Sequence, residues 1–228
     1  MRLQKFIHLS VFTALVFALS AGFASADDRN LLPKYGSMPE TDWQRQANKA
    51  FIDATDQEYH GDRAKASGDA AARGWQFLQQ GDMDTAMRRF NQAWLLNHEN
   101  GIALWGMGAV EGSRRNMDSA LKLFAEAEKF LGGDLNFSID YAKALSIIAV
   151  QKNDKALLQD AFSRFESIYK KAPQNVLNLQ NWAIALAGLS RFPEAWQKVK
   201  LAEASEERKK LDPRFVAALE QRMPRPKD

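Results

Sequence analysis

Apolar residues recur along this chain at the spacing of amphipathic helices, and the helices recur in pairs. Residues 74–93, GWQFLQQGDMDTAMRRFNQA, place small and large side chains where two short antiparallel helices need them. Gly81 and Asp82 supply a tight turn between the two helices, because glycine and aspartate favour turn conformations. This stretch therefore predicts one helix–turn–helix unit.

The same pattern of small and large residues returns 34 positions further on, and two more copies are related by the same spacing. The matching positions are Gly74 and Gly108, Ala86 and Ala120, Phe90 and Phe124, Ala93 and Ala127, and then Ala161, Phe165 and Ile168 with Ala195, Val199 and Ala202. Sequence periods of about 20 to 50 residues are typical of solenoids, in which each unit buries its apolar face against the next.

On these residues the chain resembles tetratricopeptide repeat (TPR) proteins, over roughly residues 67–208. The resemblance implies an all-α, right-handed α-solenoid of about four helix–turn–helix repeats. The repeats would span residues 67–100, 101–134, 135–174 and 175–208. A small residue in the first turn of each second helix would let the two helices approach closely, and these residues are Ala86, Ala120, Ala161 and Ala195. Only the third repeat ends in the proline expected from the resemblance, Pro173.

The third repeat is longer than the others. Ala120 and Ala161 are 41 residues apart, which is 34 plus 7. Since an α-helix has about 3.6 residues per turn, the extra residues add about two turns, one to each helix. We therefore expect helices over residues 135–151 and 155–171, joined near residues 152–154, with their apolar faces unchanged.

The first residues of the chain predict a targeting signal. Residues 1–26 have a basic head, an apolar stretch and the small residues Ala24-Ser25-Ala26, which is typical of a secretory signal peptide cleaved after Ala26. A retained membrane anchor is the alternative, because the apolar span approaches the length that crosses a bilayer. Cleavage would place the mature protein, beginning at Asp27, in the periplasm of a bacterial cell, without stable membrane insertion.

Further segments flank the repeats. Residues 27–39 contain prolines, glycine and little periodicity, which predicts an extended arm that packs back on the domain. Residues 40–66 predict an N-terminal capping segment, with a helix from the capping box of Thr41 and Gln44 to about Tyr59. Its apolar stripe would cover the open face of the first repeat and consists of Trp43, Ala47, Ala50, Phe51 and Ala54. Residues 209–228 predict a C-terminal capping helix and a short tail.

Composition and charge narrow the function classes. The chain has 31 basic and 28 acidic residues, a net charge of +3, and the predicted signal peptide contains Arg2 and Lys5 but no acid. The mature chain would therefore carry 29 basic and 28 acidic residues, a net charge of +1. That balance does not support nucleic-acid binding, which needs clustered positive charge. The sequence has no cysteine, which excludes disulfides, thiolate metal sites and cysteine catalysis.

No catalytic or cofactor-binding pattern occurs in the sequence. The histidines at positions 8, 60 and 98 belong to no metal-binding motif, and no phosphate-binding loop or serine nucleophile elbow is present. We therefore expect no metal, no cofactor and no enzymatic activity. One acid is unusual, because Glu111 stands where the first repeat has Phe77. A buried Glu111 would need Arg114 or Arg115 as its partner, but we expect its side chain to tilt to the edge and stay in water.

The first helices of stacked repeats line a concave face, the usual recognition surface of repeat proteins. The groove residues predicted from position within the repeat are Trp75, Leu78, Gln79, Trp105, Ala109, Ser113, Asn136, Ile139, Lys143, Gln180 and Ile184. This lining is nearly uncharged and contains aromatic rings, which suits an extended or helical protein segment. We expect Trp75 and Trp105 to form its centre, because tryptophans commonly anchor interfaces. The alternative is that a capping helix or a neighbouring repeat covers both.

These features predict a non-catalytic adaptor that binds another protein of the cell envelope in its concave groove. Two other functions stay open. A chaperone-like assembly factor would use the same groove for several clients, and a structural protein would self-associate through uncapped repeat ends. The adaptor predicts one partner, the chaperone several weak ones, and self-association a mass above the 25.7 kDa of the single chain.

Overall fold

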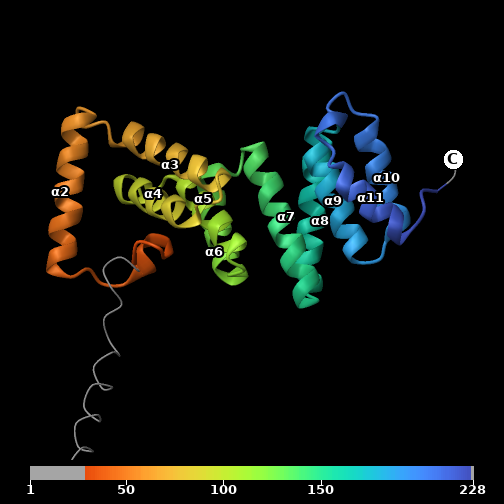
Figure 1. Ribbon diagram of the computed structural model, residues 1–228, viewed down its shortest axis with the longest axis horizontal. Coiled ribbons are helices and arrows are strands. Elements are labelled where there is room, and N and C mark those ends of the chain that lie inside the picture. Colours follow the sequence, from red (N-terminus) through yellow and green to blue (C-terminus); the bar gives the residue numbers. More distant parts are fainter. Residues whose placement is uncertain (1–28, 227–228) are drawn as a thin grey trace, which may run out of the picture.

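The computed structural model describes residues 29–226, and in this range the chain is helical, with no strand. Ten α-helices and two 3₁₀ helices follow one another within it (Figure 1). Their bounds are η1 Pro33–Ser37, α2 Asp42–Glu58, α3 Arg63–Gln79, α4 Met83–Leu96, α5 Gly101–Ser113, α6 Met117–Leu131, α7 Leu135–Lys152, α8 Lys155–Lys171, α9 Val176–Gly188, α10 Phe192–Glu203, η2 Arg208–Lys210 and α11 Pro213–Arg222. The predicted signal peptide lies outside the described residues.

Consecutive helices pack as pairs, α3 with α4, α5 with α6, α7 with α8 and α9 with α10. Each pair is one helix–turn–helix unit, and the four units follow one another along the long axis of the molecule (Figure 1). Short polar side chains accept main-chain N–H bonds at the starts of most helices, and among them are Asp82, Asn100, Asp134, Asp154 and Asn175. These caps satisfy N–H groups that have no partner inside the helix. The all-α solenoid predicted from the sequence is confirmed.

The third unit has the longest pair of helices. α7 has 18 residues and α8 has 17, whereas α5 and α9 have 13 each. Asn153 ends α7 with a left-handed backbone (φ 52°), a conformation that asparagine adopts more readily than most residues. The extra residues of this unit therefore lengthen helices and form no loop. In the first unit, the cap by Asp62 starts α3 at Arg63, four residues before the predicted start of the repeat at residue 67.

Small residues on one helix face large residues on another throughout the core. The alanine in the first turn of each second helix is buried, at positions Ala86, Ala120, Ala161 and Ala195. Phe90 of α4 lies against both α3 and α5. A Cβ atom built at Gly74 would lie 2.6 Å from its ring, and one built at Gly106 only 2.2 Å. Only glycine leaves room for the ring at these two positions, so one aromatic side chain joins the first two units.

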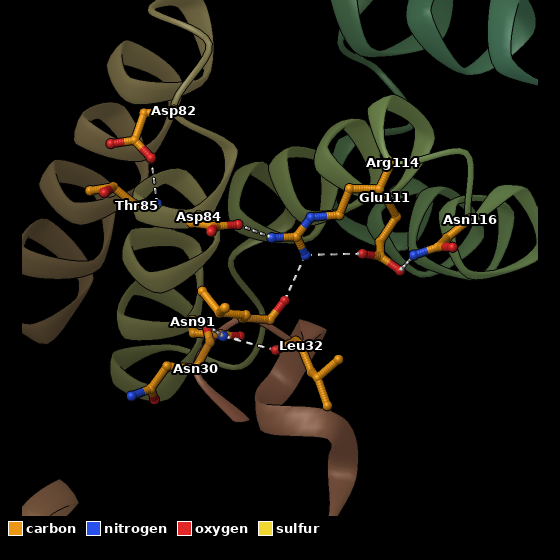
Figure 2. Close-up of polar contacts among 10 residues, drawn as sticks. Asn30, Leu32, Asp82, Asp84, Thr85, Asn91, Glu111, Arg114 and Asn116 are labelled. Carbon is orange, nitrogen blue, oxygen red and sulfur yellow. Dashed lines mark hydrogen bonds and ion pairs between the residues drawn. The ribbon is translucent and has the colours of Figure 1, made fainter. Parts of the chain in front are cut away.

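The arm formed by residues 29–39 packs back on the repeats, as predicted. The side-chain amide of Asn91, on α4, donates to the main-chain oxygens of Asn30 and Leu32 at 3.0 and 2.9 Å (Figure 2). Asn91 is fully buried beneath the arm. The arm then turns sharply within η1, where Lys34, like its two neighbours in the turn, has a left-handed backbone. Asn91 therefore holds the arm through its main chain.

Glu111 is buried, with 5% of its surface exposed. Arg114 Nη1 lies 3.5 Å from its Oε1, and Asn116 Nδ2 donates to its Oε2 at 3.3 Å. Arg114 also donates to the main-chain oxygen of Leu31 at 2.6 Å and to Asp84 of α4 at 2.7 Å (Figure 2). The expectation that Glu111 stays in water is therefore wrong. The arm and the repeats enclose it, and Arg114 supplies the partner that a buried carboxylate requires.

α2 does not cover the first repeat as predicted. It runs away from α3 toward the arm (Figure 1), Thr55 is its one buried residue, and Trp43 is 64% exposed. A cavity of about 230 Å³ lies between α2, the arm and α4. Thr41 and Gln44 do form the expected capping box. However, Arg29 of the arm also hydrogen bonds to Gln44, so the first turn of α2 is fastened to the arm and away from the repeat.

The last helix, α11, packs on the fourth unit. Leu219 is buried, and Phe215 and Val216 pack against the apolar cluster that contains Trp196 of α10. The indole N–H of Trp196 donates to the main-chain oxygen of Met223 at 3.1 Å, where α11 ends. The apolar stripe of α11 therefore covers the end of the core.

Replacing Gly106 with alanine should destabilise the protein, because the added methyl group would meet the Phe90 ring at 2.2 Å. We expect the free energy of unfolding to fall by roughly 1–3 kcal/mol, the usual cost of overpacking. Urea unfolding followed by circular dichroism measures it. Gly68→Ala in α3 is the matched control, because open space surrounds that position. Helix propensity should make this control up to about 1 kcal/mol more stable. Equal effects of the two substitutions would contradict the packing argument.

Candidate protein-binding groove

Two predicted groove residues, Trp75 of α3 and Trp105 of α5, lie against each other. Their ring centroids are 4.7 Å apart and their planes are inclined by 62°. Trp75 also contacts Phe90, and Trp105 contacts Phe137, both edge to face. Both tryptophans are half-buried. Each ring therefore supports the core on one side and leaves part of its surface accessible.

A cleft of about 290 Å³ opens between α5 and α7, whose main chains approach each other closely at few positions. α3 packs along α5 and α7 along α9, but α7 meets the second unit mainly through α6. Three predicted groove residues line the cleft, namely Ala109, Ser113 and Lys143. Other lining residues are small or apolar, including Gly108, Gly112, Ala144, Ile147 and Ile148. Because α5 presents glycine and alanine here, its side chains do not fill the space.

Ile139 does not belong to the groove surface, and its predicted assignment is wrong. It is 3% exposed and packs in the main apolar core. The accessible face of α7 carries Asn136, Asp140, Lys143 and Ile147, which follow one another at helical spacing. Burial of isoleucine is favourable and burial of the adjacent Asp140 is costly, so the helix turns Ile139 inward.

The other predicted groove residues do not gather at the cleft. Leu78 is half-buried against the core, and Gln79 is exposed at the end of α3. The side-chain oxygen of Gln180 accepts a hydrogen bond from the main-chain N–H of Asp212 at 2.7 Å, so this group is used within the protein. Ile184 is exposed on α9.

Nine of the twelve residues that line the cleft were not among the sequence predictions, and four of them show why. Asp140 and Ile147 lie on the same face of α7 as Lys143, so helical spacing alone identifies them. Met117 and Phe124 belong to α6, a second helix of its repeat. They line the cleft because α7 stands apart from α5, and no sequence signal marks that separation.

Asp140 is the acid of the cleft. Trp105 Nε1 donates to its Oδ2 at 3.2 Å, which connects the tryptophan pair to the cleft. Burial raises the pKa of Asp140, while the nearby Lys143 and the hydrogen bond from Trp105 lower it. The net pKa is raised, so the ionised carboxylate is disfavoured in the folded protein.

The described residues contain no group of three or more His, Asp or Glu side chains that could hold a metal ion. His98 lies against Trp94, with ring centroids 4.2 Å apart, which gives it a packing role. Between residues 29 and 226, no helix has both the length and the apolar character needed to cross a membrane.

The fold, although not the sequence, matches known proteins. No protein-family model matches the chain, and no curated protein matches it. TTC0263, a thermophilic TPR protein of Thermus thermophilus, is similar with a TM-score of 0.60 and 19% sequence identity, over 70% of this chain and 84% of that one. MamA of Desulfovibrio magneticus RS-1 is similar with a TM-score of 0.53 and 16% identity, over 71% of this chain and 86% of that one. The chain thus has the fold of a TPR solenoid.

Asp140→Asn should make the protein more stable at neutral pH. The native state raises the pKa of Asp140, so it binds this proton more tightly than the unfolded chain does. Stability conferred by the protonated group is present below the unfolded pKa and is lost as the pH rises through the folded pKa. Asparagine has no such titration. The advantage of the variant should therefore be largest near pH 7 and shrink below about pH 4.

Urea unfolding at several pH values measures this difference. Asp118→Asn is the control of opposite sign, because the hydrogen bond from Lys152 lowers the pKa of Asp118. That variant should lose stability at neutral pH relative to the natural protein, and the loss should fade in acid. A stability difference for Asp140→Asn that does not change with pH would contradict the assignment.

Proposed function

We propose that this protein is a non-catalytic scaffold of the cell envelope, whose groove of first helices binds an apolar segment of another protein. The observation that carries the proposal is the cleft between α5 and α7. Protein interiors are close-packed, and an accessible apolar hollow is the usual form of a binding site. The likeness in fold to TPR solenoids supports a binding role, because stacked repeats form extended recognition surfaces.

The chemistry of the cleft favours an apolar anchor. Ile147 is 36% exposed on the α7 wall, and Gly112 on the α5 wall leaves room for a close approach. Asp140 and Lys143 carry opposite charges on the same helix and offset each other. A bound segment should therefore insert aliphatic or aromatic side chains and carry little charge there. Trp105, through its bond to Asp140, extends this surface toward the first unit.

The envelope location rests on the sequence of residues 1–26, which has the features of a cleaved secretory signal. Cell fractionation followed by N-terminal sequencing tests it. The mature protein should be recovered from the periplasm with Asp27 as its first residue. Recovery from the cytoplasm, or with residues 1–26 attached, would contradict the location and leave the groove unaffected.

Crosslinking of the tagged protein in intact cells, followed by mass spectrometry, tests the scaffold itself. One dominant protein partner is expected. A broad set of unrelated clients would instead indicate a chaperone-like factor, and recovery of the bait alone would indicate self-association. Either outcome contradicts the proposal of a dedicated scaffold.

Ile147→Asp should weaken binding of that partner by at least about tenfold, because it places a charge where an apolar side chain has to be buried. Isothermal titration calorimetry with the purified partner measures the affinity. Leu201→Asp is the matched control, because Leu201 is 39% exposed on α10 and does not line the cleft. Folded Trp75→Ala and Trp105→Ala variants should also bind more weakly. The groove is the wrong site if Ile147→Asp binds as well as Leu201→Asp.

A further inference from the structure

Residues 29–58, which we call the arm–α2 unit, are fastened together by Arg29. Its guanidinium donates to the main-chain oxygens of Tyr35 and Met38 at 3.2 and 2.6 Å. It also donates to the side chain of Gln44, in the first turn of α2. The arm and α2 are therefore one body, joined to the repeats by the segment that follows α2.

A small set of polar contacts holds this unit on the repeats. Asn91 of α4 and Arg114 of the α5–α6 turn donate to three consecutive main-chain oxygens of the arm (Figure 2). Lys34 forms an ion pair with Glu126 of α6 at 2.6 Å. These contacts involve the main chain of the arm and one charged side chain, that of Lys34. They are equally good whether the arm belongs to the same chain or to a second copy.

α2 adds little apolar packing to these contacts. Thr55 is its one buried residue, and the cavity of about 230 Å³ lies between Trp43 and Phe51 on α2 and Leu95 on α4. Figure 1 shows that α2 is set apart from α4 and runs from the arm to the start of α3. Moving α2 away from the repeats therefore exposes little apolar surface.

Residues 59–62 form a tight hinge between α2 and α3. His60 and Gly61 both have left-handed backbones, with φ of 52° and 82°. In this conformation the Cβ atom of His60 crowds the following carbonyl oxygen, which is unfavourable for an L-residue. A helical hinge would remove both positive φ angles. It would join α2 and α3 into one helix from residue 42 to residue 79, about 57 Å long at 1.5 Å per residue.

We propose that two copies of this chain exchange their arm–α2 units to form a dimer. In the dimer each hinge is straight, and the arm of each copy lies on α4 and α6 of the other. A short, strained hinge invites such an exchange, and the exchange costs little when the same contacts form again. Asn91, Arg114 and Glu126 keep all their bonds, because they hold an identical arm. We infer that the bound arm comes from a second copy, because Asn91, Arg114 and Glu126 form contacts that fit the arm of this chain.

The closed monomer competes with the dimer, because a tethered arm has an effective concentration in the millimolar range. Exchange therefore increases with protein concentration and with any change that favours a straight hinge. Gly61 allows the hinge to be altered alone, since a Cβ atom built there meets nothing within 4 Å. An alanine at this position opposes the left-handed backbone without a clash.

Gly61→Ala should favour the dimer by roughly tenfold per hinge, and so by roughly a hundredfold for the two hinges of a dimer. Size-exclusion chromatography with light scattering measures the mass. Gly81→Ala is the matched control. Gly81 has the same φ of 82° and equally open surroundings, but its turn joins α3 to α4 inside a repeat. Gly61→Ala that remains a monomer at every concentration, or Gly81→Ala that dimerises equally, would overturn the proposal.

A charge exchange tests where the arm lies in the dimer. In the Gly61→Ala background, Lys34→Glu and Glu126→Lys each break the ion pair within a chain and within a homodimer. Mixing the two variants restores both ion pairs in an exchanged heterodimer, because each arm then meets the opposite charge at position 126. Native mass spectrometry should detect this heterodimer at lower concentration than either homodimer. Lys49→Glu and Asp53→Lys are the control pair, because both residues lie within α2. Mixing should not help them. A Lys34/Glu126 mixture that gains nothing would overturn the exchange, whatever the mass of the dimer.

Discussion

The arrangement of the four helix pairs depends on positions that have no large side chain, because helices can approach each other closely there. The ring of Phe90 reaches both α3 and α5 because Gly74 and Gly106 have no side chain in its way. This contact fixes the first two units to each other. On the other side of α5, Gly112 has no aromatic ring against it, and a cleft opens toward α7. Glycine therefore allows close packing between the first and second units, and it leaves the space between the second and third units accessible.

Local signals made much of the fold predictable from the sequence. The 34-residue spacing of alanine and phenylalanine indicated the helix pairs, and Thr41 with Gln44 indicated the start of α2. The position of α2 and the burial of Glu111 were not predictable in this way. Both depend on the arm, and the bond from Arg114 to Leu31 joins residues 83 positions apart. A pattern of neighbours along the chain contains no information about such a contact.

The candidate site was predictable to the extent that the units are regular. Ala109, Ser113 and Lys143 were identified from their position in the repeat, and all three line the cleft. Ile139 was misassigned because α7 is rotated so that Ile139 is buried and the adjacent Asp140 lies on the accessible face. Position within the repeat does not reveal this rotation. Phe124 was missed because it reaches the cleft from a second helix. Errors of this kind arise where the spacing between units departs from the average.

Because the main chains of α5 and α7 approach each other closely at few positions, we expect the four units to bend most easily between the second and the third. A chain of packed units bends most easily where its neighbours share the least surface. The first two units are joined through α3 and α5, and the last two through α7 and α9, so each half is stiffer than the joint at α6 and α7. In the proposed function, a segment bound in the cleft would brace the two halves against each other. Occupancy would then change the curvature of the molecule and, with it, the distance between its two ends.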